Sequence, residues 1–121
     1  MDVIGLWRIV EINAMDMSFK QSWRSVDDLD GVPEMQRMMA KAAFMFEEGG
    51  RLLQLLPKEM DVDGGHEAYD DAYVVGQANG WKEEGGRLMV SNMDDSEEVW
   101  TEAVQAGDMI EVYGFFRLSK A

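Results

Sequence analysis

The sequence predicts an all-β fold, an eight-stranded up-and-down antiparallel barrel with one short helix after the second strand. A repeated segment supports this prediction: Glu-Glu-Gly-Gly-Arg occurs at residues 47–51 and again at 83–87, each time between apolar segments that suit strands. Paired glycines accept the positive φ that a tight hairpin turn requires, so each copy predicts a hairpin. Further short apolar segments recur between turn residues, and eight antiparallel strands can close into a barrel without exposed edges.

The first half of the chain contains the expected helix. Residues 3–12 are rich in apolar and β-branched side chains and predict the first strand, and residues 17–24 alternate between bulky and polar side chains and predict the second. Pro33 suits the first turn of a helix at about 33–40. Helix propensity alone would extend this helix to residue 48, but the hairpin repeat favours a strand over about 41–48. We therefore predict a short helix followed by a strand.

The second half of the chain is expected to be almost entirely strands and turns. Turn residues at 94–96 and 106–108 separate the last strands, and residues 58–71 form an acidic loop. The remaining strands are expected at residues 51–56, 72–82, 88–92, 99–104 and 109–118.

Length and charge limit the possible classes of partner. The 121 residues predict one domain, 1–121, and 46% of them are hydrophobic, as in ordinary globular proteins. With 24 acidic and 11 basic residues the net charge is −13, which disfavours nucleic acid and anionic membranes as partners.

Residues 1–8 resemble neither a signal peptide nor a membrane span. The lack of cysteine is compatible with a reducing compartment, so we expect a cytoplasmic location unless a leader peptide has been removed. The sequence leaves the oligomeric state open.

The first and last predicted strands carry a family resemblance. Gly5 and Trp7 form the Gly-x-Trp pattern that opens the first barrel strand of the lipocalin-like, or calycin, superfamily, and Arg117 matches its basic residue near the last strand. In element order the whole chain resembles small bacterial lipocalin-like domains of unassigned function. The resemblance implies that Arg117 lies across Trp7 and that the two strands are neighbours; a guanidinium also stacks well on an indole ring. It further implies an apolar ligand inside the barrel.

Side chains that point into such a barrel are the candidate binding residues. If Arg117 meets Trp7, alternation places Glu111, Tyr113 and Phe115 on the same inward face. An eight-stranded barrel can be filled by side chains or can hold one small ligand. We therefore expect non-enzymatic binding of a small, mostly apolar ligand, with a filled barrel that serves as an interaction or structural module as the alternative. The candidate interior residues are Phe44, Phe46, Trp100, Glu111, Tyr113 and Phe115.

Methionines are frequent, with 11 in the chain, and three lie in the predicted helix at positions 35, 38 and 39. Flexible thioether side chains there could form an adaptable lid over the open end of the barrel or could plug it. Both roles place the helix at that end.

Residues 59–70 have the spacing of a calcium-binding loop, with acidic residues at positions 1, 3, 5, 9 and 12 and Gly64 at position 6. His66 occupies position 8, where an aliphatic residue is usual, and Asp70 stands at position 12 in place of glutamate. We expect a solvated acidic loop and no metal.

No catalytic constellation is visible, and we expect neither an enzyme nor a cofactor. The single histidine, His66, has no nucleophile and orienting group at a recognisable spacing. Catalysis would require carboxylates such as Glu11, Glu102 or Glu111 inside the barrel, where an unpaired charge is costly.

Overall fold

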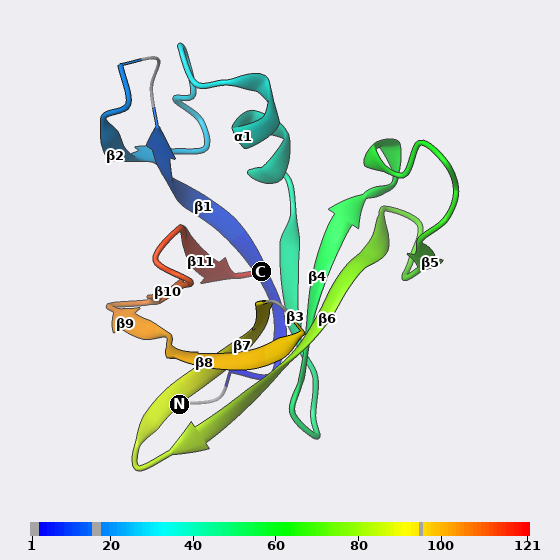
Figure 1. Ribbon diagram of the computed structural model, residues 1–121, viewed down its shortest axis with the longest axis vertical. Coiled ribbons are helices and arrows are strands. Elements are labelled where there is room, and N and C mark those ends of the chain that lie inside the picture. Colours follow the sequence, from blue (N-terminus) through cyan, green and yellow to red (C-terminus); the bar gives the residue numbers. More distant parts are fainter. Residues whose placement is uncertain (1–2, 16–17, 95) are drawn as a thin grey trace.

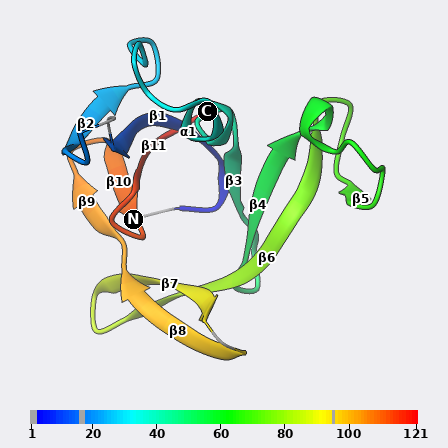
Figure 2. The same ribbon diagram turned by 45° about the horizontal axis from the view of Figure 1, so that its top comes forward.

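Eleven strands form one antiparallel sheet that curls into a nearly closed barrel (Figure 1). The computed structural model describes residues 3–15, 18–94 and 96–121. Nine strands follow one another around the barrel in the order β8-β7-β6-β4-β3-β1-β11-β10-β9, whereas β2 pairs with β1 and β5 with β6 outside this path. Figure 2 shows the ring-like arrangement of the strands on this path. The predicted all-β antiparallel barrel is confirmed at this level.

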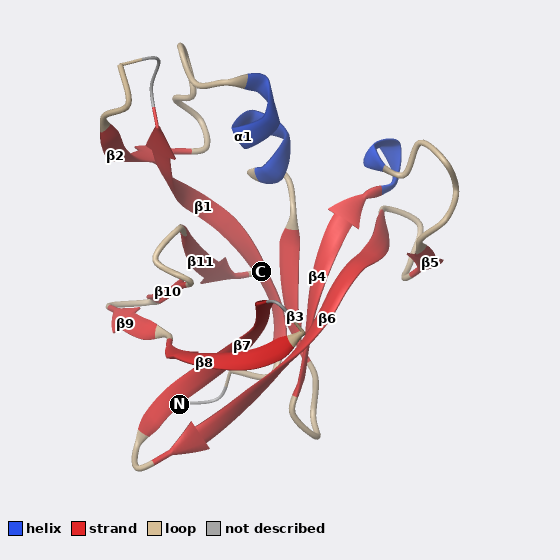
Figure 3. Cartoon of the chain, viewed as in Figure 1, coloured by secondary structure: helices blue, strands red, loops and turns tan. Residues whose placement is uncertain are grey.

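Helices contribute little to the described residues: α1 (Glu34–Met39) and the 3-10 helix η1 (Lys58–Met60) are the two that occur (Figure 3). None of the described helices is long and apolar enough to cross a membrane. The strands are β1 (Gly5–Met15), β2 (Gln21–Ser25), β3 (Ala43–Phe46), β4 (Arg51–Pro57), β5 (Glu67–Ala68), β6 (Tyr73–Glu84), β7 (Arg87–Asp94), β8 (Glu97–Glu102), β9 (Val104–Ala106), β10 (Met109–Val112) and β11 (Phe116–Lys120).

Both glycine pairs form hairpin turns, as predicted. Gly49 and Gly50 lie between β3 and β4, and Gly85 and Gly86 lie between β6 and β7. All four have φ between 61° and 96°. A side chain would strain this backbone, so the paired glycines fix where these hairpins turn.

Two of the eight predicted strands are each divided into two strands, and a third predicted strand lies outside the barrel path. The barrel path therefore contains nine strands in place of the predicted eight. The strand predicted at 99–104 changes partner at Ala103: β8 before it pairs with β7, and β9 after it pairs with β10. The N–H of Ala103 donates to the carbonyl of Leu88 at 2.8 Å. The strand predicted at 109–118 is a hairpin, β10 and β11, with its turn at residues 113–115. The second predicted strand corresponds to β2.

The first and last described strands are neighbours, as predicted. β1 and β11 pair antiparallel from Trp7 opposite Lys120 to Ile12 opposite Phe116, with an irregularity between Ile9 and Glu11. On its other edge β1 pairs with β3 near its start and with β2 near its end. β1 therefore lies at the centre of this side of the barrel.

The predicted helix followed by a strand is confirmed by α1 and β3. Gln36 on α1 holds the helix against the end of β1, because its side chain accepts a hydrogen bond from the N–H of Met15 at 3.0 Å and donates one to the Met15 carbonyl at 3.4 Å. Some expectations lie outside the described residues, namely those on residues 1–2, on Met17 at the start of the second strand, and on Asp95 in the predicted turn.

Aromatic rings fill the end of the barrel interior near the two glycine hairpins. Trp7 and Trp81 each contact Phe46 edge to face, with centroids 6.2 and 5.9 Å apart. The indole N–H of Trp7 donates to the carbonyl of Val3, and that of Trp81 donates to the carbonyl of Glu47, both at 2.8 Å. The interior is therefore closely packed at this end, with both indole N–H groups satisfied.

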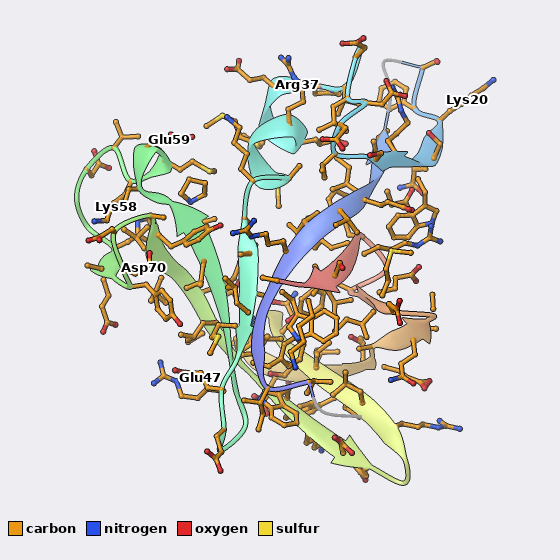
Figure 4. The ribbon with its side chains drawn as sticks, turned by 180° about the vertical axis from the view of Figure 1, so that it is seen from behind. Lys20, Arg37, Glu47, Lys58, Glu59 and Asp70 are labelled. Carbon is orange, nitrogen blue, oxygen red and sulfur yellow. The ribbon has the colours of Figure 1, made fainter. Side chains whose placement is uncertain are left out.

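Figure 4 shows labelled charged side chains, among them Arg37 and Asp70, at the periphery of the molecule.

Candidate ligand-binding pocket

Beyond these rings, toward α1, the barrel interior holds a pocket of about 370 Å³. Volumes of about 300–1,000 Å³ are typical of small-molecule sites. One part of its wall is aromatic and consists of Phe44, Tyr113, Phe115 and Phe116. Another part consists of the amide side chains of Gln54, Gln77, Asn79 and Asn92, and Met39 of α1 completes the lining.

The aromatic wall is a set of rings in mutual contact. Phe44 lies 5.7 Å from Phe116 and 6.3 Å from Tyr113, measured between centroids. Phe115 and Phe116 pack edge to face at 4.7 Å. These separations are those of favourable aromatic pairs, so the rings hold each other in place.

Two of these rings reach the pocket from the turn between β10 and β11. Tyr113 and Gly114 have φ of 59° and 66°. Left-handed backbone costs a tyrosine about 1 kcal/mol, so neighbouring contacts must hold it. Asn13 supplies two of them: its N–H donates to the carbonyl of Phe115 at 2.8 Å, and its side chain donates to the carbonyl of Gly114 at 3.3 Å.

The hydroxyl of Tyr113 connects the aromatic wall to β7. It donates a hydrogen bond to the carbonyl of Ser91 at 2.8 Å. Burial raises the pKa of Tyr113 to about 12, and a hydrogen bond with the Asn79 side chain opposes this rise. The phenol is therefore neutral at physiological pH and has a fixed orientation.

The amide side chains come from three neighbouring strands. Gln54 on β4 pairs across the sheet with Gln77 on β6, and Gln77 donates to the side-chain oxygen of Asn92 on β7 at 3.5 Å. The Asn79 Oδ1 is buried and has no hydrogen-bond partner among the described residues. None of the described residues that line this pocket carries a charge. The pocket thus combines an apolar aromatic wall with neutral hydrogen-bonding groups.

The methionines of α1 have different positions. Met39 lines the pocket, whereas Met35 is 75% exposed and Met38 is 37% exposed. The predicted location of the helix at the open end of the barrel is confirmed, but one methionine of the three lines the pocket.

Four of the predicted interior residues lie in the interior, but in two different places. Phe44, Tyr113 and Phe115 line the pocket. Phe46 is fully buried and packs between Trp7 and Trp81 at the filled end.

The predictions for Trp100 and Glu111 were wrong, because both lie on the outer face of the barrel. The indole N–H of Trp100 donates to Glu98 at 3.1 Å, and the Lys82 Nζ lies 4.3 Å from its ring centroid. Glu111 accepts a hydrogen bond from Arg117 at 3.4 Å. A shift of one residue in a strand exchanges its two faces; the inward residues of β10 and β11 are Ile110, Val112, Phe116 and Leu118.

The wrong face of Glu111 follows from the expected contact between Arg117 and Trp7, which was itself wrong. Trp7 faces the core and is 2% exposed, whereas Arg117 faces outward and its guanidinium carbon lies 4.0 Å from the centroid of Trp23. The cation nearest the ring of Trp7 among the described contacts is Lys120, at 5.9 Å. Gly5, the other residue of the pattern, has φ of 134° and lies opposite Phe46.

Residue patterns had not identified the amides or Phe116 as site residues, whereas Met39 had been predicted to lie over the open end of the barrel. One signal was present, since Gln54 interrupts the apolar run Leu-Leu-Gln-Leu-Leu at a position that alternates with the inward Leu52. Gln77 and Asn79 share a face by the same alternation. A polar residue on the buried face of a strand often indicates a site.

The acidic loop contains no group of three acidic or histidine side chains that could hold a metal ion within the described residues. Asp61 binds His66, with its Oδ1 2.8 Å from the Nδ1 of the ring and 3.3 Å from the backbone N–H. The hydrogen bond from the His66 side chain lowers the pKa of Asp61. Part of this loop forms β5, which pairs with β6.

Comparisons with protein-family models, curated proteins and solved structures find no match to this chain. The resemblance to lipocalin-like domains therefore stays a prediction.

Proposed function

We propose that the protein binds a small, mostly apolar ligand in the pocket between the aromatic wall and the amide side chains. The observation that supports this most directly is that the barrel interior is filled at one end and hollow at the other. The pocket of about 370 Å³ is open to solvent and lined by four aromatic residues, and a concave, mostly apolar surface with a few polar groups is typical of small-molecule sites.

The side chains that line the pocket are suited to binding a ligand and not to catalysing a reaction. Amides, a thioether, a phenol and phenyl rings can orient a ligand by shape and hydrogen bonds, but none of them is an activated nucleophile or a general base near neutral pH. Burial of apolar area would supply affinity, and the amides would supply orientation.

The lipocalin-like resemblance belongs to this proposal. The sequential strand order around the barrel and the pairing of β1 with β11 support it. A cytoplasmic location is proposed on the lack of cysteine alone.

The alternative is an interaction or structural module. The packing of Phe46 against Trp7 and Trp81 favours it for one end of the barrel. It would require the pocket end to be filled as well, for example by rearrangement of Met39.

Thermal unfolding against a library of neutral apolar compounds tests the proposal. A ligand at 100 times its Kd stabilises the folded state by about 2.7 kcal/mol, which corresponds to a rise of roughly 10 °C in Tm for a chain of this size. A broad library that raises Tm with no compound would reject the proposal.

A blocking variant locates the binding. Asn92→Trp on β7 places a large side chain at the pocket and should abolish the ligand-induced shift. Met93→Trp is the matched control, because Met93 is the next residue, is 50% exposed and does not line this pocket. Equal shifts in the two variants would place the ligand elsewhere.

A further inference from the structure

Strand β8 exposes one of its two backbone edges. Among the described strands it pairs with β7 and with no other, at one end of the path around the barrel. The N–H of Ala103 donates to the carbonyl of Leu88 on β7, so these two residues form a hydrogen-bonded pair. Hydrogen-bonded pairs alternate along an antiparallel ladder, so the odd-numbered residues of 97–101 also bond to β7. The residues whose N–H and carbonyl groups point to the open side are Glu98, Trp100 and Glu102.

The open edge of β8 lies in line with β10. By the same alternation, β9 pairs with β10 on this side of the chain, with Val104 opposite Glu111. β10 ends at Val112, and the chain turns back into β11 at residues 113–115 (Figure 2). The edge of β8 beyond this turn stays open over residues 98–102, a length of about 16 Å at about 3.3 Å per residue. One short strand would fit in this gap.

A pocket of about 380 Å³ lies beside the open edge, and Val99, Thr101, Tyr113 and Gly114 are among the residues that line it. Val99 and Thr101 belong to the inner face of β8, because Thr101 lies opposite the fully buried Val90. The inner face of a closed barrel is covered, yet Val99 is 42% exposed. The pocket therefore offers space for apolar side chains of a strand beside β8.

The outer face beside the same edge is acidic. Glu98 and Glu102 flank Trp100 on this face, and both glutamates are exposed. The nearby Lys82 lies over the ring of Trp100, 4.3 Å from its centroid. Antiparallel pairing of two copies of β8 about Trp100 would set Glu98 against Glu102, and like charges directly opposite each other are destabilising. Charge complementarity favours a basic strand over a second copy of this chain.

We propose that β8 binds an extended basic peptide segment of another protein, which adds a strand along residues 98–102. The backbone of the peptide pairs with the open N–H and carbonyl groups. Because side chains alternate along a strand, its apolar residues enter the pocket beside Val99, and its lysine or arginine residues lie next to Glu98 and Glu102. This interaction is separate from the proposed small-ligand binding, although Asn92 and Tyr113 line both pockets.

Fluorescence anisotropy with dye-labelled heptapeptides tests the proposal on the intact protein. Lys-Val-Lys-Val-Lys-Val-Lys has the required alternation. Lys-Lys-Val-Val-Val-Lys-Lys has the same composition and charge without the alternation, and a third peptide repeats the first with N-methyl groups on the lysine backbone, which remove the donors that face β8. We expect the first peptide to bind at least roughly tenfold more tightly than the other two, because each of them loses backbone or side-chain pairing.

A charge-reversal variant locates the interaction. Glu98→Lys with Glu102→Lys should weaken binding of the alternating lysine peptide at least roughly tenfold and should allow Glu-Val-Glu-Val-Glu-Val-Glu to bind. Glu34→Lys with Glu67→Lys is the matched control, because it changes the net charge equally at exposed positions on α1 and β5. Circular dichroism confirms that the variants are folded. The comparison of peptides on the unchanged protein is decisive if the charge-reversal variant does not fold.

The other outcomes overturn the proposal. Equal binding of the two lysine peptides of the same composition would show general attraction to an acidic protein. No binding of any peptide would show that the glutamates serve only to protect the strand edge from pairing. If no peptide binds and sedimentation velocity shows a dimer, a second copy of the chain occupies the edge. The compound library tests the proposed small-ligand binding independently, so the two proposals can fail separately.

Discussion

At the scale of single residues, Arg117 joins four strands on the outer face of the barrel. Its guanidinium stacks on Trp23 of β2 and reaches Glu11 of β1 at 3.1 Å and Glu111 of β10 at 3.4 Å. The side chains of Arg117 and both carboxylates are 24–28% exposed. Partial burial makes these contacts stronger than ordinary surface ion pairs, although solvent still screens them.

Substitution of Arg117 should therefore destabilise the protein. We expect Arg117→Ala to lower the free energy of unfolding by about 1–2 kcal/mol, from two ion pairs and one cation–π contact. Arg117→Lys should recover less than half of this loss, because an ammonium lacks the planar fork. Arg87→Ala, which removes an exposed positive charge, is the control for the net charge. Urea denaturation measures all three, and equal losses for Arg117→Ala and Arg87→Ala would contradict the prediction.

The phenol of Tyr113 should lose its proton at a higher pH than an ordinary tyrosine. Its folded pKa of about 12 lies above the ordinary value of 10.0, so the folded state favours the neutral phenol. The resulting stabilisation is complete below about pH 10 and is lost as the pH rises through about 12. The ultraviolet absorbance of tyrosinate should show a late step that is absent in Tyr113→Phe. If the high-pH step in tyrosinate absorbance persists in Tyr113→Phe, another tyrosine is responsible for it and the prediction is wrong.

Sequence reasoning at this scale predicted several pocket-lining aromatic residues correctly but was less successful in predicting which face of a strand a residue occupies. Phe44, Tyr113 and Phe115 do line the pocket. The face of Glu111 was wrong because it was deduced from a contact between Arg117 and Trp7 that does not exist.

At the scale of elements, α1 is short and is held against β1 by hydrogen bonds from one side chain, Gln36. It has no buried residue and no side-chain cap at its N-terminus. A six-residue helix is not stable by itself in water. The two hydrogen bonds between Gln36 and Met15 therefore anchor it to β1.

Loss of this anchor should loosen the helix and leave the barrel intact. We expect Gln36→Ala to cost about 1–2 kcal/mol and to speed hydrogen exchange of residues 34–42, while β1 and β11 stay protected. Met35→Ala, at an exposed position on the same helix, should change neither. Faster exchange throughout the barrel in Gln36→Ala would show that the helix is integral to the core.

Elements with strong local signals were predicted well. The glycine pairs fixed the hairpins, and Pro33 marked the helix start within one residue. The prediction of one continuous last strand over 109–118 was wrong, because the turn between β10 and β11 contains one glycine between two aromatic residues, Tyr113-Gly114-Phe115. Such a segment resembles part of an apolar strand. The change of partner at Ala103 has no local sequence signal, because it depends on which strands lie nearby in space.

At the scale of the whole molecule, the net charge of −13 acts against the folded state. Like charges repel more strongly when the chain is compact, and dissolved salt screens them. Chloride salts show this effect more cleanly than sulfate, which also stabilises proteins by exclusion from their surface.

Sodium chloride should therefore raise Tm. Between about 0.02 M and about 0.5 M salt, we expect an increase of a few degrees, because the screening length falls well below the size of the protein. Differential scanning calorimetry measures the shift. A fall in Tm would mean that specific ion pairs, such as those of Arg117, outweigh the overall repulsion.

The pairing of β1 with β11 has a consequence for biosynthesis. The ribosome makes β1 long before β11, so the backbone edge of β1 that β11 covers stays open until the final strand is complete. Open strand edges can pair with those of other nascent chains, and closure between distant segments is slow. The excess of acidic residues keeps such chains apart during this interval, so the same charge that weakens the finished barrel protects it while it is being made.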